Sequence, residues 1–309
     1  MSMELVNSTI APNHLERVIG NTPLFHIQRV FSNPTVNIFA KLEWMQLGGS
    51  IKSRAAFEII KHALNSGALD SGQELLDASS GNTAISYAAI GAALAIPVTI
   101  CLPENASKER ITMLKAHGAN LIYTSRFGGT DEAQIKAKEL KKQDPDRFYY
   151  ADQYNNSNNW KAHYQPTAEE IIRQTKGSVT HVVGGLGTSG TAMGLGRKLK
   201  QHNPDIKLIT LQPDLAMHNL EGWKHMETAL VPGIYDPEVA DYNLEIDSGK
   251  ALAMVKDIAE KEGLLVSPSS AANLLGAITV ANELESGTVV TVFPDNAEKY
   301  SEILSQVFG

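Results

Sequence analysis

The sequence predicts an α/β fold with a doubly wound, largely parallel sheet and helices on both faces, and three observations support this prediction. Short β-branched runs alternate with helix-forming runs along most of the 309 residues. Glycine- and hydroxyl-rich turns separate such runs at 79–83 and at 187–191. Hydrophobic residues make up 43% of the chain, which is enough for one sizeable core or two smaller ones.

These patterns predict the individual helices and strands. Residues 19–24 end a short helical pattern, and 73–103 reads as strand, turn, helix and strand. Residues 217–241 contain two prolines and little periodicity, which predicts an extended surface excursion. Residues 263–275 read as strand, turn and helix, and a last strand lies in 287–300. The other expected strands are 37–44, 119–124, 147–151 and 206–211, and the other expected helices are 51–64, 107–117, 130–143 and 248–262.

The stretch 179–200 is the clearest candidate site, because a β-branched run, a glycine-rich turn and a helix-forming run follow one another there. Glycines let backbone N–H groups converge on one point, three hydroxyls surround it, and the helix adds the positive end of its dipole. These features predict a site for a phosphate dianion, although a tight turn without a ligand is an alternative. The turn consists of Gly187, Thr188, Ser189, Gly190 and Thr191.

The same stretch contains the pattern G-x-G-x-x-G from Gly185 to Gly190, so a nicotinamide dinucleotide is a second possible ligand. That fingerprint requires an acid about 20 residues further on, which binds a ribose hydroxyl. Here the next apolar run ends in Gln212-Pro213, and the first acid beyond it is Asp214. The fingerprint alone is therefore a weak signal.

Lys52 occupies an unusual position. Gly48-Gly49 ends the strand before it and Ser50 is a good N-cap, so Lys52 is expected in the first turn of a helix, where a cation opposes the helix dipole. A solvated lysine on an exposed face is the ordinary interpretation. The functional one is an amine whose pKa is lowered by the dipole and by burial, so that it can attack a carbonyl.

A second polar turn lies at the start of the helix that follows the strand near residue 75. It places hydroxyls, an amide and free backbone N–H groups at a helix N-terminus, which suits a carboxylate better than a simple cap does. This polar turn contains Ser79, Ser80, Gly81, Asn82 and Thr83.

The Asn-rich run 153–160 is expected to be a loop that lines a cleft between two α/β halves.

Composition excludes several classes of partner. The formal net charge is -7 and no run of Lys or Arg is longer than a pair, which argues against nucleic acid and anionic membranes. The single cysteine, Cys101, excludes an internal disulfide and is expected to be a buried small hydrophobe. The N-terminal residues lack a signal-peptide pattern, and no stretch reaches the roughly 18 apolar residues of a membrane span. A cytoplasmic protein with small ligands and no metal site is expected.

Several separated motifs match one family. They are I-G-N-T-P-L at 19–24, G-G-S-I-K-S-R around Lys52, A-S-S-G-N-T around Asn82, G-L-G-T-S-G-T at 185–191 and P-S-S-A-A around Ser269. Through them nearly the whole chain resembles the cysteine synthase (O-acetylserine sulfhydrylase) and cystathionine beta-synthase family of fold-type II pyridoxal-phosphate enzymes.

The resemblance implies two doubly wound α/β domains of the tryptophan synthase beta type, with pyridoxal 5'-phosphate in the cleft between them, and a homodimer. A larger domain, 1–40 and 157–309, would bind the cofactor phosphate. A smaller mobile domain, 41–156, would carry the Schiff-base lysine and the substrate carboxylate loop.

The resemblance also implies residue roles. Lys52 would form the Schiff base, Asn82 would bond the ring hydroxyl of the cofactor, and Ser269 would face its pyridine nitrogen. Residues 187–191 would hold the cofactor phosphate. The substrate carboxylate would bind to Ser79, Ser80, Thr83 and Gln153.

A neutral serine opposite the pyridine nitrogen leaves that nitrogen unprotonated, which favours β-elimination over transamination. The expected reaction is β-replacement on an activated serine, O-acetylserine or O-phosphoserine, by a sulfur nucleophile through an aminoacrylate.

Departures from the family pattern leave the substrate open. Gln46-Leu47 stands where the family usually has Asn-Pro, and Lys52-Ser53-Arg54 where it has Lys-Asp-Arg. Cystathionine beta-synthase or another β-replacement or β-elimination enzyme is the main alternative, and an inactive binding homologue is a further one. Lys224 and His225 have two open interpretations: they are solvated surface charges, or they overhang the cleft, where a cation suits a phosphate or thiosulfate group.

Overall fold

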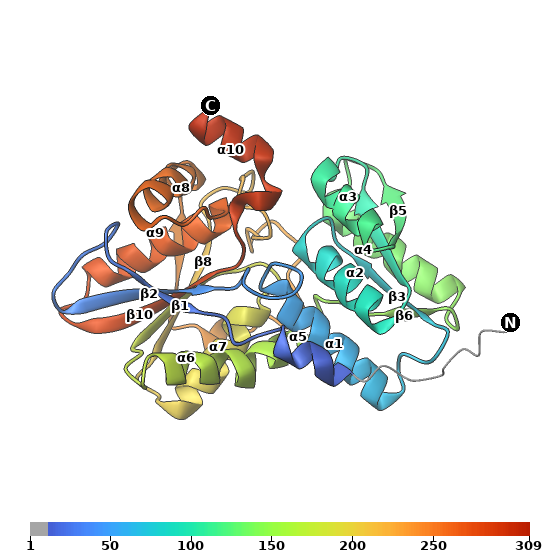
Figure 1. Ribbon diagram of the computed structural model, residues 1–309, viewed down its shortest axis with the longest axis horizontal. Helices are drawn as coiled ribbons and strands as arrows, with labels where there is room; N and C mark the ends of the chain where they lie inside the picture. Colours follow the sequence, from blue (N-terminus) through green and yellow to red (C-terminus); the bar gives the residue numbers. More distant parts are fainter. Residues whose placement is uncertain (1–11) are drawn as a thin grey trace, which may run out of the picture.

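The computed structural model describes residues 12–309, which form two lobes with one sheet each (Figure 1). The large-sheet strands are β1 (Leu24–Ile27), β2 (Val36–Leu42), β7 (His181–Gly185), β8 (Lys207–Pro213), β9 (Tyr242–Ile246) and β10 (Gly287–Phe293). The small-sheet strands are β3 (Glu74–Ala78), β4 (Val98–Pro103), β5 (Asn120–Thr124) and β6 (Phe148–Tyr150). The strand orders are β1-β2-β10-β7-β8-β9 and β5-β4-β3-β6. Only the pairing of β1 with β2 is antiparallel among these strands, which confirms the predicted parallel α/β class.

Helices cover both faces of each sheet. The α-helices are α1 (Lys52–Ser66), α2 (Asn82–Leu94), α3 (Lys108–Ala116), α4 (Gly129–Gln143), α5 (Asn158–Ala162), α6 (Ala168–Gln174), α7 (Gly190–His202), α8 (Ser248–Glu262), α9 (Pro268–Asn282) and α10 (Ser301–Phe308). Shorter turns are the 3-10 helices η1 (Pro12–Arg17), η3 (Pro237–Val239) and η4 (Ala297–Lys299) and the π-helical turn η2 (His163–Thr167).

The large sheet lies between two helical layers, α8 with α9 and α6 with α7 (Figure 1). Neighbouring residues of β7 show why both faces need a cover, because successive side chains of a strand point to opposite sides. Val183 packs in the cluster that contains Leu274 of α9, whereas Val182 packs in the cluster that contains Leu195 of α7.

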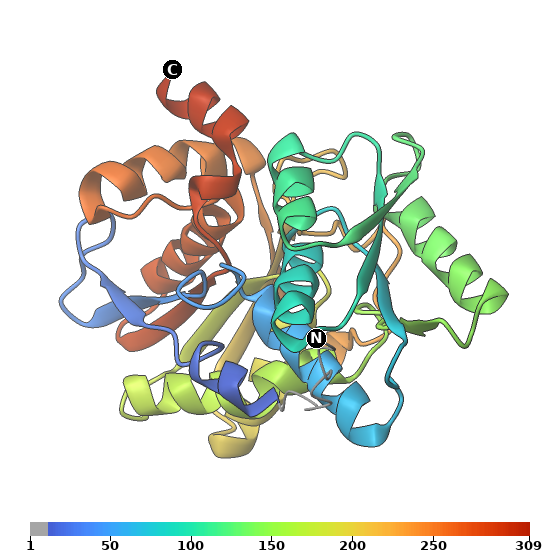
Figure 2. The ribbon, with the colours of Figure 1, turned by 45° about the vertical axis from the view of Figure 1, so that its right-hand side comes forward.

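The small sheet follows the same rule. Leu75 of β3 packs with residues of α1 and α2, whereas its neighbour Leu76 packs with Ala133 and Ala137 of α4. Helices α1 and α5 lie between the two lobes, and the turned view of Figure 2 also places them there. The first residue of α1 is therefore held where the lobes meet.

The structure differs from the sequence analysis at three strands. Residues 263–267 form no strand, because Val266 makes only an isolated bridge to Asn296. Strands β1 and β9 were not predicted; both are short edge strands, whose half-exposed residues give little periodicity. The last strand, β10, was predicted within 287–300 and is found there, in the middle of the sheet between β2 and β7.

The segment 217–241 is irregular apart from η3, as expected, but it is not a surface excursion. Leu220 is fully buried and Trp223 is 8% exposed. A Cβ added at Gly185 would lie 2.1 Å from the Trp223 ring, so this segment covers the end of β7 closely. A glycine is needed at 185 for that contact.

Within residues 12–309, no helix combines the length and the apolar character that crossing a bilayer requires. The same part of the chain contains no group of three or more His, Cys, Asp or Glu side chains arranged to hold a metal ion. Cys101 is fully buried, and burial raises the pKa of its thiol to about 12, as expected for a structural cysteine.

Candidate active site

A cavity of about 1170 Å³ lies between the lobes. Its walls come from the start of α1, the turns after β3 and β7, the loop after β6, the start of α9 and the segment around residue 223. These turns follow the carboxyl ends of parallel strands, which is where ligands bind in open α/β sheets. The sequence-predicted residues are thus brought to one place from distant parts of the chain.

Lys52 lines this cavity as the first residue of α1. Its backbone N–H donates to Ser50 Oγ at 3.3 Å, although Ile51 rather than the predicted Ser50 is the N-cap residue. Burial lowers the pKa of the Lys52 amine, and the nearby carboxylate of Asp295 opposes this only in part. A lysine with a lowered pKa is more often neutral, which is the form that attacks carbonyl groups.

The backbone of the turn 187–191 is closely packed against its neighbours. Ser189 has φ of 69°, and α7 begins immediately after it at Gly190. A Cβ at Gly190 would lie 1.9 Å from Asn159 Oδ1, and one at Gly187 would lie 2.0 Å from the Gly222 carbonyl oxygen. The Ser189 hydroxyl is buried without a hydrogen-bond partner, so the turn carries a polar group that a phosphate oxygen would satisfy.

Thr191 of this turn contacts a histidine that the sequence analysis did not identify. His163 Nε2 lies 3.4 Å from Thr191 Oγ1, and its Nδ1 lies 3.1 Å from Thr167 Oγ1. Burial lowers the pKa of His163 to about 3, so its ring is neutral at physiological pH. It therefore adds hydrogen bonding but no charge beneath the turn. A lone histidine in a helical run carries no pattern that would have predicted this contact.

The turn after β3 and the loop after β6 meet as predicted. Ser79, Ser80, Thr83 and Gln153 all line the cavity. Thr83 Oγ1 donates to Gln153 Oε1 at 2.7 Å, and Gln153 Nε2 donates to the Ala78 carbonyl oxygen at 3.0 Å. Gln153 is thus fixed against the turn, and the hydroxyls around it form a neutral, donor-rich pocket that suits a carboxylate.

Asn82, the first residue of α2, is held by two residues that the sequence analysis also missed. Its Nδ2 donates to Asp295 Oδ2 at 2.7 Å, and its Oδ1 accepts from Lys299 Nζ at 2.8 Å. These partners lie more than 200 residues further along the chain, after β10, so no local pattern connects them with Asn82.

Ser269 lies in the first turn of α9, lines the cavity and is 4% exposed. Its Oγ is 3.0 Å from Oγ of Ser267, the N-cap of this helix. Asn273 Oδ1 accepts from the Gly185 N–H at 2.8 Å, so α9 is tied to the strand that leads into the turn 187–191. The predicted serine and the predicted phosphate turn are therefore positioned by the same helix.

Two ionic contacts at the wall of the cavity join the lobes. Arg110 of α3 pairs with Glu221, and Lys224 Nζ lies 3.8 Å from Asp131 Oδ1 of α4. Lys224 lines the cavity, and burial lowers the pKa of its amine. His225, its predicted companion, instead bonds Thr228 through Nδ1 at 3.0 Å.

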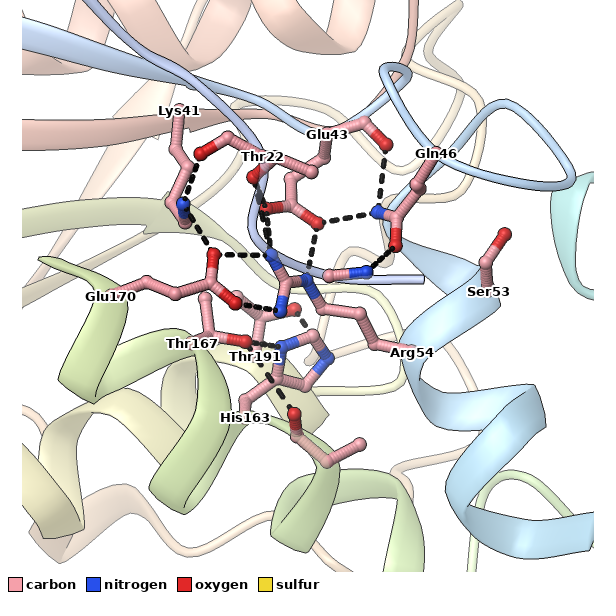
Figure 3. Close-up of polar contacts among 12 residues, drawn as sticks. Thr22, Lys41, Glu43, Gln46, Ser53, Arg54, His163, Thr167, Glu170 and Thr191 are labelled. Carbon is pink, nitrogen blue, oxygen red and sulfur yellow. Dashed lines mark hydrogen bonds and ion pairs between the residues drawn. The ribbon is translucent and has the colours of Figure 1, made fainter. Parts of the chain in front are cut away.

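A buried ionic cluster joins Arg54 of α1 to Glu43, Glu170 and Lys41 (Figure 3). The Arg54 guanidinium pairs with Glu43 at 2.6 Å and with Glu170 at 2.8 Å, and Lys41 Nζ lies 2.7 Å from Glu170. Two cations and two carboxylates thus balance one another, joining the end of β2, helix α1 and helix α6. Because Arg54 follows Lys52 by two residues, the cluster fixes the start of α1 and the position of Lys52.

Comparisons with known proteins agree with this geometry. Residues 15–295 match the family model described as pyridoxal-phosphate dependent enzyme. The chain is 43% identical to a cysteine synthase of Aquifex aeolicus over 291 residues, 92% of this chain and 89% of that protein.

Two solved structures are also similar. A cysteine synthase of Entamoeba histolytica has a TM-score of 0.90 at 31% identity, over 100% of this chain and 94% of that one. An O-acetylserine dependent cystathionine beta-synthase of Helicobacter pylori has a TM-score of 0.86 at 30% identity, over 93% of this chain and 96% of that one. The chain therefore belongs to the family of pyridoxal-phosphate-dependent enzymes, and not to the nicotinamide dehydrogenases that its glycine fingerprint also suggested.

Proposed function

We propose that this protein synthesises L-cysteine by replacing the β-substituent of an activated serine, O-acetylserine or O-phosphoserine, with a sulfur nucleophile. The observation that carries the proposal is the position of Lys52, a lysine with a lowered pKa that lines one cavity together with residues of the turns 79–83 and 187–191. The cysteine synthases among the relatives support the same activity.

The residues present fit pyridoxal 5'-phosphate. The buried Ser189 hydroxyl without a partner and the side-chain-free approach at Gly187 and Gly190 suit its phosphate, with Thr188 and Thr191 adding hydroxyls. Lys52 would be its attachment point, Asn82 would bond its ring oxygen, and Ser269 would face its ring nitrogen. When bound, the cofactor supplies the electron sink that weakens bonds at the α- and β-carbons of an amino acid.

Side chains of the protein would then transfer the proton and orient the substrate. Lys52 Nζ, freed when substrate binds, would remove the α-hydrogen, and its lowered pKa keeps it a competent base near neutral pH. Ser269 cannot supply a negative charge, so the ring nitrogen opposite it would stay unprotonated. The substrate carboxylate would bind at the turn that holds Ser79, Ser80 and Thr83, beside Gln153, which would orient the substrate within the cavity.

A second candidate is cystathionine synthesis, because the relative from Helicobacter pylori is named for that activity. The two reactions differ in the sulfur nucleophile, small for sulfide and bulky for homocysteine. They are separated by incubating the purified holoenzyme with O-acetylserine, O-phosphoserine or serine, each with sulfide or homocysteine, and identifying the products by mass spectrometry. Cysteine formation at the highest kcat/KM supports the proposal; cystathionine from homocysteine as the best product would replace it.

The domain division and setting are further parts of the proposal. The smaller domain would span 41–156 and close over the cofactor, and the larger would comprise 1–40 and 157–309; the two separate sheets support this division. We expect a cytoplasmic homodimer. Light scattering after size exclusion would measure the dimer, and a monomer at micromolar concentration would contradict it.

A further inference from the structure

The side chain of Asn82 is held at both of its polar atoms. Its Nδ2 donates to Asp295 Oδ2 at 2.7 Å, and its Oδ1 accepts from Lys299 Nζ at 2.8 Å. Asp295 is 1% exposed and Lys299 is 7% exposed, so water competes little for either contact. Asn82 itself lines the cavity.

The chemistry of these two partners allows only one orientation of the amide. An ammonium group can only donate and an ionised carboxylate can only accept, whereas the oxygen and nitrogen of an amide are nearly equal in shape. A flipped amide would set NH₂ against the Lys299 ammonium and its carbonyl against the Asp295 carboxylate. Two charge-assisted hydrogen bonds would become two repulsions, so the flipped state is excluded.

Each partner is fixed in turn. Lys299 Nζ also donates to the Gly49 carbonyl oxygen at 2.9 Å, in the turn that precedes α1 and Lys52. The Tyr300 hydroxyl donates to Asp295 Oδ2 at 2.7 Å, and Ser270 Oγ donates to the Asp295 backbone oxygen at 2.7 Å. The pair thus connects the start of α2 with the starts of α1 and α9.

We propose that Lys299 and Asp295 are positioning residues that lock Asn82 as a fixed hydrogen-bond donor toward the cavity. The Nδ2 group has two hydrogens, and Asp295 takes one of them. The other is left for a ligand, and only an acceptor can receive it. In the proposed function, on which this inference rests, that acceptor is the ring oxygen of the cofactor, which the lock holds in its ionised form.

The test uses Asp295→Asn and Lys299→Met in the full-length protein. An asparagine at 295 can donate or accept, and a methionine at 299 does neither, so each variant removes one of the two charged partners that hold the Asn82 amide. Glu298→Gln is the matched control, because Glu298 is an exposed acid beside Lys299 that takes no part in the lock. Lys299→Arg keeps a cation that can only donate.

Two readouts are needed. Spectrophotometric titration of each apoprotein with pyridoxal 5'-phosphate gives Kd, and the ratio of the two absorption bands of the bound cofactor reports whether its ring oxygen is ionised or protonated. We expect both lock variants to raise Kd by about five- to tenfold, as for one lost hydrogen bond, and to increase the protonated share. Glu298→Gln and Lys299→Arg should change neither by more than about twofold, a difference too small for a lost hydrogen bond.

Unchanged band ratios in both lock variants, with cofactor bound, would overturn the inference. A wild-type protein that binds no pyridoxal 5'-phosphate would instead overturn the proposed function. Circular dichroism identifies any variant that fails to fold; the isosteric Asp295→Asn then decides alone, since it removes a charge without changing volume.

Discussion

Replacing Glu170 by Gln tests how the buried ionic cluster holds the start of α1. Glu170 receives hydrogen bonds from both Arg54 and Lys41, and its side chain is 8% exposed. Glutamine keeps the shape but removes the charge, which leaves two buried cations facing the single carboxylate of Glu43 (Figure 3). Breaking a buried pair from one side is costly because the remaining charge is uncompensated.

The magnitude follows from the pKa of Glu170. Burial alone would raise it, but the hydrogen bonds and charges of Arg54 and Lys41 outweigh burial and lower the pKa from 4.5 to about 2. At about 1.4 kcal/mol per pKa unit, this difference corresponds to about 3 kcal/mol of stability. Because the folded-state pKa is the lower one, this stability is complete above the unfolded value of 4.5 and is lost as the pH falls toward 2.

The assay is urea unfolding of wild type and variant. Near neutral pH, Glu170→Gln should lower the free energy of unfolding by about 3 kcal/mol, and at about pH 3.5 the difference between wild type and variant should shrink by about 1 kcal/mol. Glu260→Gln is the control, because Glu260 pairs with Lys256 on the surface and should change stability by at most about 1 kcal/mol. The reasoning would be refuted if Glu170→Gln and Glu260→Gln lowered the free energy of unfolding equally. It would also be refuted if the difference between wild type and Glu170→Gln did not shrink at low pH.

Three further predictions concern the cavity. Lys224→Ala should raise KM for O-phosphoserine or thiosulfate about tenfold and leave O-acetylserine with sulfide nearly unchanged, because only the anionic groups need a cation; equal effects in steady-state kinetics would place Lys224 outside recognition. Ser80→Ala and Thr83→Ala should weaken amino-acid binding more than cofactor retention, and unchanged substrate affinity in both spectral titrations would contradict the carboxylate site. Gly190→Ala would drive a Cβ to 1.9 Å from Asn159 Oδ1, so the Kd for pyridoxal 5'-phosphate should rise at least about tenfold, and wild-type affinity would contradict this close approach.

Local patterns predicted most of the fold. Helix α8 was expected at 248–262 and is found there. Helix α1 was expected to begin at residue 51 and begins at Lys52. The patterns failed where an element depends on distant partners. Residues near Val266 are apolar enough for a strand, but Val266 makes only an isolated bridge to Asn296 and packs in the core cluster of the large sheet.

The candidate site divides in the same way. Turns at strand ends are local in sequence, so the residues of 79–83 and 187–191 could be predicted to face a cavity, and they line or support it. Side chains that bind the site residues from distant parts of the chain were not predicted. Neither Glu170 nor Asp295 lies in a motif, and each meets its partner only because separate elements fold together.

The central claim is that Lys52 is the attachment point of the cofactor, and covalent mapping tests it most directly. The purified protein is loaded with pyridoxal 5'-phosphate, reduced with borohydride to make the linkage permanent, digested and mapped by mass spectrometry. We predict a single modified peptide with the label on Lys52, and no stoichiometric label in Lys52→Ala. A label on another cavity lysine such as Lys224 or Lys299, or no label on the wild type, would contradict the account.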